Sequence, residues 1–433
     1  MEIEHALSVF GGIELRPTQR QIIEAVLDKH DVLVFMPTGS GKSLTFQLPA
    51  IADSTGCTLV ISPLLALMDN QIQGLLAKGI YAATINHRTA DETRQSIQKS
   101  LLKGQGPKLL YISPELACSD GFKTIVDQLV ESSFLNRVVV DEAHCALEWG
   151  REFRKEYAQL GFFKAKYPDL QMMALTATAT ADARKKIASS LKLKNPKVFS
   201  TSVNRSNTHY EVNYVEDPTE RLRSIIRFLK TYKKRIESVY GREKMPYPGC
   251  GLIYCRSRAT TEQVAEQLRD SGIGAYAYHA KLEASEKERV MNRWLEGDPD
   301  YMVVVATIAF GMGVDKPDTR FVIHFDMPQN IEQFSQQTGR AGRDGKACLS
   351  ILYYSLQGRN MGVRFARTEQ EIESLKALAL YGETITKCRH LSLASYFEQV
   401  PDKPHVWCEF ACDICKSQRK VQKSYESWQD SFY

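Results

Sequence analysis

The sequence predicts an α/β protein with two parallel-sheet domains in tandem, followed by a small helical module. Short apolar or β-branched runs alternate with helix-like segments, which is typical of parallel sheets covered by helices. A length of 433 residues is enough for two or three domains. Hydrophobic residues make up 43% of the chain and charged residues 25%, an ordinary globular composition that excludes disorder over most of it.

Each domain is predicted from its strands. In the first domain, residues 1–205, we expect strands at 31–35, 58–62, 108–112, 137–140 and 172–176. The pattern restarts in the second domain, residues 206–355, with strands expected at 251–254, 274–278, 302–306, 321–325 and 350–353. The third module covers 356–418, and the polar composition of the tail, 419–433, predicts a segment without regular structure.

An amphipathic helix is predicted at 220–234, with apolar side chains on one face. Its other face carries Arg221, Arg223, Arg227, Lys230, Lys233 and Lys234. A solvated charged face is favoured over a phosphate contact.

Charge, apolar runs and cysteine usage indicate where in the cell the protein acts. The net charge of +5 is too small to indicate nucleic acid by itself. No apolar run approaches the roughly 20 residues of a membrane-spanning helix, and the first residues do not resemble a signal peptide. Most of the ten cysteines are scattered singly, unlike those of a secreted disulfide protein. We therefore expect a protein that is not secreted and has no membrane partner, nuclear in a eukaryote and otherwise cytoplasmic.

A phosphate-binding loop follows the first predicted strand, with the sequence Met36-Pro37-Thr38-Gly39-Ser40-Gly41-Lys42-Ser43. Gly39 and Gly41 allow backbone N–H groups to turn towards phosphate oxygens. Lys42 provides a charge for the β- and γ-phosphates, and Ser43 a hydroxyl for Mg²⁺. A chance turn is the alternative, and the strand–loop–helix context disfavours it.

An acidic motif follows the predicted strand 137–140, namely Asp141-Glu142-Ala143-His144. Acids at the carboxyl end of a strand lie where open α/β sheets bind ligands. Asp141 is expected to hold Mg²⁺, and Glu142 to orient and deprotonate the attacking water, a role worth roughly 10²–10⁴-fold. A surface turn with two acids is the alternative, but it leaves the apolar strand before them unexplained. The two motifs together predict an enzyme that hydrolyses a nucleoside triphosphate.

The C-terminal module contains a cysteine cluster, Cys388, Cys408, Cys412 and Cys415. Four thiolates can close a tetrahedral structural Zn²⁺ site that leaves no position open for catalysis. His390 and His405 lie nearby in the sequence, and either could replace a thiol. A histidine alone is more often an ordinary surface residue, which we expect of both.

The order of these motifs resembles that of RecQ-type DNA helicases of superfamily 2, over residues 8–416. The resemblance also rests on Phe10, Leu15-Arg16-Pro17-Thr18-Gln19, Ser62-Pro63-Leu64-Leu65-Ala66-Leu67-Met68, Ser113-Pro114-Glu115 and Glu148-Trp149-Gly150-Arg151-Glu152-Phe153-Arg154. It continues through the runs at 175–179, 253–258, 306–316 and 336–345. The lead-in Gly249-Cys250-Gly251 is most similar to the short eukaryotic RecQ5-type branch.

The resemblance implies two RecA-like domains that close over ATP. Arg16 and Gln19 would read the adenine, and Asp315 would accept from the ribose hydroxyls. Arg343 would reach the γ-phosphate as an arginine finger, worth about 10³–10⁵ in rate, with Arg340 in support. A loop arginine paired with a carboxylate is the alternative for Arg343.

The resemblance also implies a DNA contact in the aromatic-rich run. Trp149 and Phe153 would stack on bases at roughly 1–3 kcal/mol each, and Arg154 would add charge. Periodicity alone favours another interpretation, in which Trp149, Phe153 and Tyr157 form one core face of a helix. The position directly after the acidic motif favours the DNA contact.

The predicted activity is ATP-dependent 3′-to-5′ DNA unwinding in repair or recombination, with Thr176 and Thr178 coupling nucleotide to DNA. The partners expected are single-stranded and forked DNA, possible repair or replication proteins, and no second copy of the chain. The family's zinc module implies a helix at 385–399. The sequence departs from the family pattern at Gly12, Arg151, Lys155, Lys281 and Gln337. These departures bear on the nucleotide preference and on the coupling of hydrolysis to DNA, and not on the assignment to the helicase class. An RNA-dependent ATPase and a non-enzymatic DNA-binding or annealing module are the competing interpretations.

Overall fold

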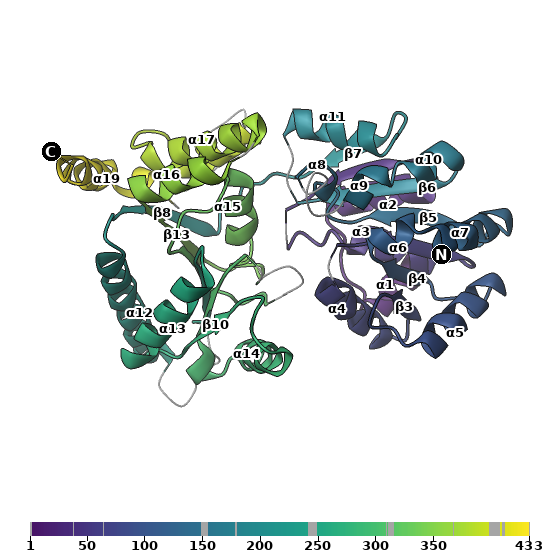
Figure 1. The fold of residues 1–433 in the computed structure, drawn as a ribbon, viewed down its shortest axis with the longest axis horizontal. Helices are drawn as coiled ribbons and strands as arrows, with labels where there is room; N and C mark the ends of the chain where they lie inside the picture. Colours follow the sequence, from purple (N-terminus) through teal and green to yellow (C-terminus); the bar gives the residue numbers. More distant parts are fainter. Residues whose placement is uncertain are drawn as a thin grey trace. The chain divides into compact units, whose positions relative to one another are not determined.

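A computed structural model of the chain describes residues 2–37, 39–63, 65–148, 155–177, 180–240, 249–308, 310, 316–366, 368–397, 408 and 412–432 (Figure 1). The chain divides into two units, Met1–Ser202 and Val203–Tyr433. Each unit has its own parallel sheet with helices packed on it. The predicted α/β class with two parallel sheets is therefore confirmed.

The first unit contains a seven-stranded parallel sheet in the order β3-β4-β2-β5-β6-β1-β7. Its strands are β1 (Val32–Phe35), β2 (Cys57–Ile61), β3 (Ala82–Ile85), β4 (Leu109–Ile112), β5 (Leu135–Val140), β6 (Gln171–Thr176) and β7 (Lys197–Ser200). Its helices are α1 (Glu2–Val9), α2 (Pro17–Leu27), α3 (Leu44–Ala52), α4 (Leu65–Leu76), α5 (Asp91–Leu102), α6 (Pro114–Cys118), α7 (Asp120–Glu131), α8 (Cys145–Glu148), α9 (Lys155–Gln159), α10 (Phe162–Lys166) and α11 (Ala181–Ser190). The five predicted strands are present, whereas the two edge strands, β3 and β7, were not predicted.

The central strands are apolar throughout because both faces of the sheet are covered. In β1, Leu33 and Phe35 belong to one hydrophobic core, whereas Val32 and Val34 belong to another. Successive side chains of a strand point to opposite faces, so each core receives every second residue. Because helices cover both faces, the carboxyl edge of the sheet is left for the loops that follow the strands, and these loops meet there.

The second unit contains a six-stranded parallel sheet in the order β10-β11-β9-β12-β13-β8. Its strands are β8 (Thr208–Tyr214), β9 (Gly251–Tyr254), β10 (Ala275–Tyr278), β11 (Val303–Ala306), β12 (Phe321–His324) and β13 (Cys348–Tyr354). Its helices are α12 (Pro218–Tyr240), α13 (Arg258–Asp270), α14 (Ala284–Glu296), the 3₁₀ turn η1 (Pro299–Tyr301), α15 (Ile331–Thr338), α16 (Leu356–Phe365), α17 (Glu369–Glu383), α18 (Arg389–Tyr396) and α19 (Asp413–Asp430). The five predicted strands are present, and the edge strand β8 was not predicted.

The tail forms a helix, so the prediction of a segment without regular structure is wrong. Helix α19 runs to Asp430 and packs on the edge strand β8. Trp428 is 7% exposed, and its ring centroid lies 5.6 Å from those of Tyr214 and Tyr354. A few aromatic residues at helical spacing are enough to bind an otherwise polar helix to the sheet edge. Among the described residues, no helix has the length and apolar composition needed to cross a membrane.

Candidate active site and metal centre

The phosphate-binding loop joins β1 to α3 at the carboxyl edge of the first sheet, as its sequence context predicted. Gly39 and Gly41 have φ angles of 82° and 78°, a left-handed conformation that favours glycine. A Cβ on Gly41 would collide with the amide nitrogen of Gln19. The loop therefore needs glycine at this position both for its conformation and for the close approach of α2.

Lys42 and the two acids of the acidic motif meet at this edge. The Lys42 Nζ lies 3.4 Å from Glu142 Oε1 and 3.7 Å from Asp141 Oδ1. Strand β5 delivers the acids and β1 delivers the lysine, with β6 between them in the sheet. Parallel strands bring their carboxyl ends to one edge, which explains how residues so far apart in sequence meet.

Burial governs the electrostatics of this cluster. Burial raises the pKa of Asp141 to about 6, and the Lys42 charge only partly offsets that effect. Burial alone would lower the pKa of Lys42, but the Glu142 and Asp141 carboxylates outweigh it and raise this pKa. The lysine is thus held as a cation, whereas Asp141 needs a positive partner to remain ionised near neutral pH.

Two further residues, Tyr157 and His144, contact the acidic motif, and neither was predicted as a site residue. Glu142 has a left-handed φ of 49°, and its N–H donates to Asp141 Oδ1 at 3.0 Å. The buried Tyr157 hydroxyl donates to the Asp141 carbonyl oxygen at 2.8 Å. His144 Nδ1 lies 2.8 Å from Thr176 Oγ1 and 3.4 Å from Glu142 Oε2. The position of His144 two residues after Glu142 was the only signal that could have indicated its role.

Gln19 and Arg16 flank the same loop at the start of α2. The Gln19 side-chain amide donates to the carbonyl oxygens of Ser40 and Gly41, each at 3.2 Å. Its oxygen accepts from the Arg16 N–H at 2.9 Å, and an Arg16 Nη1 donates to the Ser40 oxygen at 3.4 Å. Both predicted adenine-binding residues are therefore close to the phosphate-binding loop.

The donors present fit Mg²⁺, which prefers hard oxygen ligands. Asp141 supplies a buried carboxylate, and the half-buried Ser43 supplies a hydroxyl at the N-terminus of α3.

Six of the predicted site residues lie outside the described part of the chain, namely Thr38, Trp149, Phe153, Arg154, Thr178 and Asp315. Tyr157, which one alternative placed on a core helix face with Trp149 and Phe153, is fully buried.

The two predicted arginines follow α15 in the second unit. Arg340 is 8% exposed, and Arg343 is half-buried with its Nε 3.4 Å from the Gly339 carbonyl oxygen. Burial raises the pKa of Tyr254, and the charges of Arg340 and Arg343 partly oppose that rise. Both guanidinium groups therefore lie near the carboxyl end of β9.

The four cysteines of the module meet, as predicted. Their Sγ atoms all lie within 4.8 Å of one another, and those of Cys412 and Cys388 are 3.9 Å apart. A tetrahedron of sulfurs about 2.3 Å from a zinc ion has edges of about 3.8 Å, so the cluster fits Zn²⁺. Hydrogen bonds with Cys408 and Cys412 lower the pKa of Cys388, whereas hydrogen bonds with Cys388 and Cys412 raise the pKa of Cys408. Four thiolates this close repel one another, so a bound cation would offset their charge.

Residues beside the cysteines lock the cluster onto the second sheet. The buried Arg389 donates to both Asp413 carboxylate oxygens, at 3.0 and 3.1 Å. Asp413 also accepts from the Val212 N–H at 3.0 Å, on the edge strand β8. The predicted helix at 385–399 begins later, at Arg389, so Cys388 caps it instead of lying in its first turn.

The histidine predictions have different outcomes. His390 is 2% exposed, so its prediction as a surface residue is wrong. Its Nδ1 lies 2.7 Å from Asn204 Oδ1, and its ring meets the Tyr210 ring edge-on at 4.8 Å. His405 lies outside the described residues.

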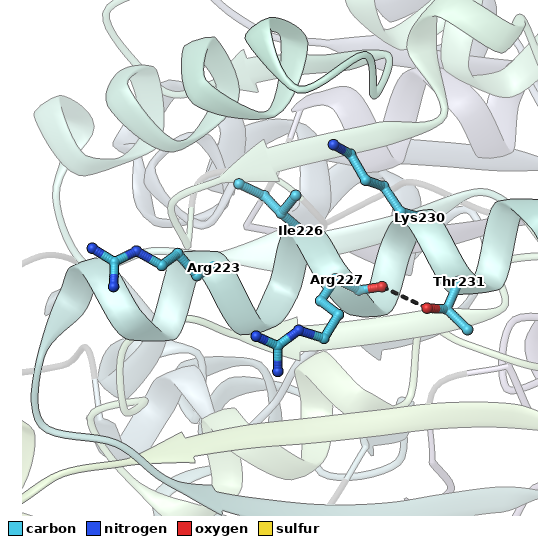
Figure 2. Close-up of a pocket in the computed structure, with 5 residues that line it drawn as sticks. All are labelled: Arg223, Ile226, Arg227, Lys230 and Thr231. Atoms are coloured by element: carbon cyan, nitrogen blue, oxygen red, sulfur yellow. Dashed lines mark hydrogen bonds between the residues drawn. The ribbon is translucent and has the colours of Figure 1, made fainter.

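Arg223, Arg227 and Lys230 on the basic face of α12 are exposed, which fits the predicted solvated face, whereas the side chains of Lys233 and Lys234 lie outside the described part of the structure. Arg223, Arg227 and Lys230 line a shallow groove of about 320 Å³ with Ile226 and Thr231. Figure 2 shows Lys230 and Arg227 pointing to opposite sides of the helix, so the cations do not converge on one ligand. Arg221 was predicted on this face but is 3% exposed, because its guanidinium donates to the Phe325 carbonyl oxygen at 2.7 Å.

Three family models match the chain in succession. They are DEAD/DEAH box helicase over residues 16–187, helicase conserved C-terminal domain over 231–345, and RecQ zinc-binding over 356–416. The first covers the Lys42 and Asp141 motifs, the second covers both arginines, and the third covers all four cysteines.

Several curated proteins are similar over nearly the whole chain. The ATP-dependent DNA helicase RecQ of Pasteurella multocida is 40% identical over 422 residues, which cover 96% of this chain and 62% of the relative. The ATP-dependent helicase SGS1 of Saccharomyces cerevisiae is 38% identical over 426 residues, covering 95% and 28% respectively. The ATP-dependent DNA helicase Q5 of Rattus norvegicus is 38% identical over 446 residues, covering 98% and 44%. The chain thus spans 28% to 62% of the length of these relatives.

Solved structures share the fold of two RecA-like domains. The helicase MrfA bound to DNA is similar with a TM-score of 0.67 at 20% identity, over 88% of this chain and 56% of that one. Dbp5 of S. cerevisiae bound to RNA and ADP BeF3 is similar with a TM-score of 0.63 at 14% identity, over 98% of this chain and 97% of that one. Because helicase models match both units and the RecQ zinc-binding model matches the cysteine module, the chain belongs to the RecQ family of helicases.

Proposed function

We propose that the chain is the catalytic core of an ATP-dependent DNA helicase that moves 3′ to 5′ along one strand and separates the duplex, in DNA repair or recombination. The Lys42–Asp141–Glu142 cluster carries the proposal, with Lys42 Nζ 3.7 Å from Asp141 and 3.4 Å from Glu142. A phosphate-directed lysine beside a metal-binding acid and a general base is the donor set of nucleotide hydrolysis. In a eukaryotic cell this activity belongs in the nucleus.

ATP phosphates compete with the two carboxylates for Lys42. When Lys42 turns to the β- and γ-phosphates, Glu142 is released to accept a proton from the attacking water. Ser43 and Asp141 would hold Mg²⁺, which would offset negative charge on the phosphates. The remaining nucleotide contacts in the proposal come from Arg16, Gln19, Thr38, Gly39, Gly41 and Asp315.

The second unit supplies the arginine finger in this proposal. Arg343 stabilises charge on the transferred γ-phosphoryl group, and Arg340 supports it from a buried position. Such a group acts mainly in the transition state, so it affects hydrolysis more than ATP binding.

In this proposal DNA binds the aromatic-rich run after the acidic motif, and its binding affects the position of Glu142. Trp149 and Phe153 stack on bases, and Arg154 contacts the backbone. Thr176 lies 2.8 Å from His144, which lies 3.4 Å from Glu142, so a shift at the end of β6 reaches the general base through one histidine. Thr178 completes the coupling segment. Single-stranded and forked DNA are the substrates, bound by one copy of the chain, and repair or replication proteins are possible partners.

Phosphate release measured with single-stranded DNA, with RNA and with neither tests the substrate class. Strand separation on duplexes with a 3′ or a 5′ tail tests polarity. We expect stimulation by DNA and unwinding of the 3′-tailed duplex only. Stimulation by RNA alone would indicate an RNA-dependent ATPase, and DNA binding without hydrolysis would indicate a non-enzymatic module.

Two variants make the test specific to the site. Arg343→Ala should reduce single-turnover hydrolysis by about 10³-fold or more with ATP affinity retained. Arg223→Ala removes a comparable guanidinium from the exposed face of α12 and should leave the rate within a few-fold of the parent. A parallel loss of ATP affinity in Arg343→Ala would make Arg343 a ground-state binder instead.

A further inference from the structure

The first residues of the second unit lie against the loop that carries Arg340 and Arg343. Arg205 donates from Nη1 to the Thr338 carbonyl oxygen at 3.4 Å, and its Nη2 donates to the Ala341 carbonyl oxygen. Asn207 Nδ2 donates to the carbonyl oxygens of Gly342 and Lys346, both at 2.9 Å. Two side chains thus hold four backbone carbonyls of one loop.

The Arg205 contacts lie at the C-terminal end of helix α15 and in the loop that follows it. The last carbonyl groups of a helix lack partners within the helix and carry its partial negative charge. Thr338 is the last residue of α15, and its carbonyl oxygen also accepts the N–H of Ala341, three positions further along, at 3.2 Å. The planar guanidinium can span both carbonyls at once, whereas a lysine ammonium is a single point charge.

Asn207 closes the other side of the loop. Its side chain donates to two carbonyls, and its own carbonyl oxygen accepts from the Cys348 N–H at 2.9 Å. Gly342 has a φ of 60°, and a Cβ there would lie 2.7 Å from Asn207 Nδ2 and 2.6 Å from Cys348 Sγ. The loop backbone is therefore packed directly against the asparagine amide, with no room for a side chain.

The segment is anchored on a second side as well. Asn204 Oδ1 lies 2.7 Å from Nδ1 of the buried His390, in helix α18 of the cysteine module. Arg205 also accepts, through its carbonyl oxygen, the Thr208 N–H at 2.9 Å, at the start of β8. The segment 204–207 therefore connects the cysteine module, the edge strand β8 and the loop that carries Arg340 and Arg343.

We propose that Arg205 and Asn207 are positioning residues that hold the backbone of 338–346 so that Arg340 and Arg343 keep the geometry needed for hydrolysis. The inference rests on the proposed function, since it assigns these two residues to the arginine-finger step. A misplacement of about 1 Å can cost about 10²-fold in rate, so a clamp on the loop backbone affects chemistry without touching ATP.

The test compares Arg205→Ala, Arg205→Lys and Asn207→Asp with the matched control Arg223→Ala. Asn207→Asp keeps the side-chain shape but cannot donate to the two carbonyls. Single-turnover ATP hydrolysis should fall about 10- to 100-fold in Arg205→Ala and Asn207→Asp, with a smaller loss in Arg205→Lys. The affinity for a fluorescent ADP analogue and the control variant's rate should stay within a few-fold of the parent.

Two further measurements separate positioning from general stability. Because Arg205 acts through the loop arginines, Arg205→Ala/Arg343→Ala should be no slower than Arg343→Ala alone. Amide hydrogen exchange at 339–346 should increase in Arg205→Ala and Asn207→Asp, while exchange in β9 and β12 stays unchanged. If Arg205→Ala does not fold, Asn207→Asp and Arg205→Lys provide the same comparison.

Each result has a defined meaning. Hydrolysis within a few-fold of the parent in both Arg205→Ala and Asn207→Asp, multiplicative losses in the double variant, or unchanged exchange at 339–346 would overturn the positioning role. A parent protein without hydrolysis, or an unaffected Arg343→Ala, would overturn the proposed function. In that case the exchange measurement still decides whether the two residues hold the loop.

Discussion

The Lys42 ammonium and the Glu142 carboxylate lie 3.4 Å apart although they are separated by 100 positions in the sequence. Asp141 Oδ1 lies 3.7 Å from the same ammonium, so one cation compensates two largely buried acids. Removing a partner from such a group leaves uncompensated charge, which costs more than the pair itself contributes. A change at Lys42 is therefore expected to affect both the free energy of unfolding of the first unit and nucleotide hydrolysis.

Lys42→Ala should abolish hydrolysis and lower the free energy of unfolding by about 1–3 kcal/mol, because both carboxylates lose their cation. Urea unfolding and phosphate release check the two effects. Adding Asp141→Asn and Glu142→Gln should recover the stability but not the activity. A triple variant as unstable as Lys42→Ala would show that lost packing, not charge, caused the effect.

His144→Ala should uncouple DNA from hydrolysis, since it removes the group between Thr176 and Glu142. We expect unstimulated hydrolysis within a few-fold of the parent and DNA stimulation reduced by about tenfold or more. Thr176→Val breaks the same contact from the other side, so the double variant should be no worse than either single one. Full DNA stimulation in both single variants would contradict the coupling.

His324 should make the second unit sensitive to acid. Burial lowers its pKa to about 3, although the hydrogen bond with Gln337 at 2.9 Å opposes that shift. The unfolded chain has an ordinary histidine pKa of about 6.5, so it binds a proton that the folded state excludes. The stability contributed by neutral His324 is thus complete above about pH 6.5 and is lost as pH falls towards about 3, by roughly 1.4 kcal/mol per pH unit.

The measurement is urea unfolding of the parent and of His324→Phe at several pH values between neutral and about pH 4. The variant should show a shallower loss of stability on acidification, even if it is less stable at neutral pH. His87→Phe, at an exposed position, is the matched control and should keep the parent's slope. Equal slopes in all three proteins would exclude His324 as the source.

Zinc removal should unfold the cysteine module, because binding at a structural zinc site contributes folding free energy. Elemental analysis should find about one zinc per chain. A strong chelator, or Cys412→Ser, should lower the unfolding temperature on the order of 10 °C. Cys118→Ser, outside the cluster, should retain both metal and stability, and a metal-free protein of full stability would refute the site.

Trp428→Ala should release α19 from the edge strand β8. The indole is 7% exposed, and its Nε1 donates to Glu216 Oε1 at 3.0 Å. Loss of a buried tryptophan costs about 3–5 kcal/mol, and somewhat less at a helix end that can adjust. Thermal unfolding should show the loss, whereas Lys423→Ala on the exposed side of α19 should change little. Equal stability of the two variants would mean that α19 is not held by this ring.

The sequence alone determined the parts whose chemistry restricts residue type over a short span. A phosphate loop needs glycines at fixed offsets, so Gly39, Gly41 and Lys42 could be recognised without a structure. The cysteine cluster followed in the same way, because a zinc site needs four closely spaced thiols. Central strands were predictable because a sheet covered on both faces requires continuous apolar runs. The edge strands β3, β7 and β8 lack that constraint and were missed.

Only the tertiary structure decided which distant polar groups meet. Nothing in the local pattern around Asn207 indicates that its amide binds the Gly342 carbonyl, 135 positions away. The same holds for His390 on Asn204 and for Trp428 on Glu216, at separations of 186 and 212 positions. Such contacts depend on where the sheets place their edges and loops, whereas sequence spacing reports only neighbours along one helix or strand. The proposed catalytic groups could therefore be named from the sequence, whereas the residues that hold them in place could not.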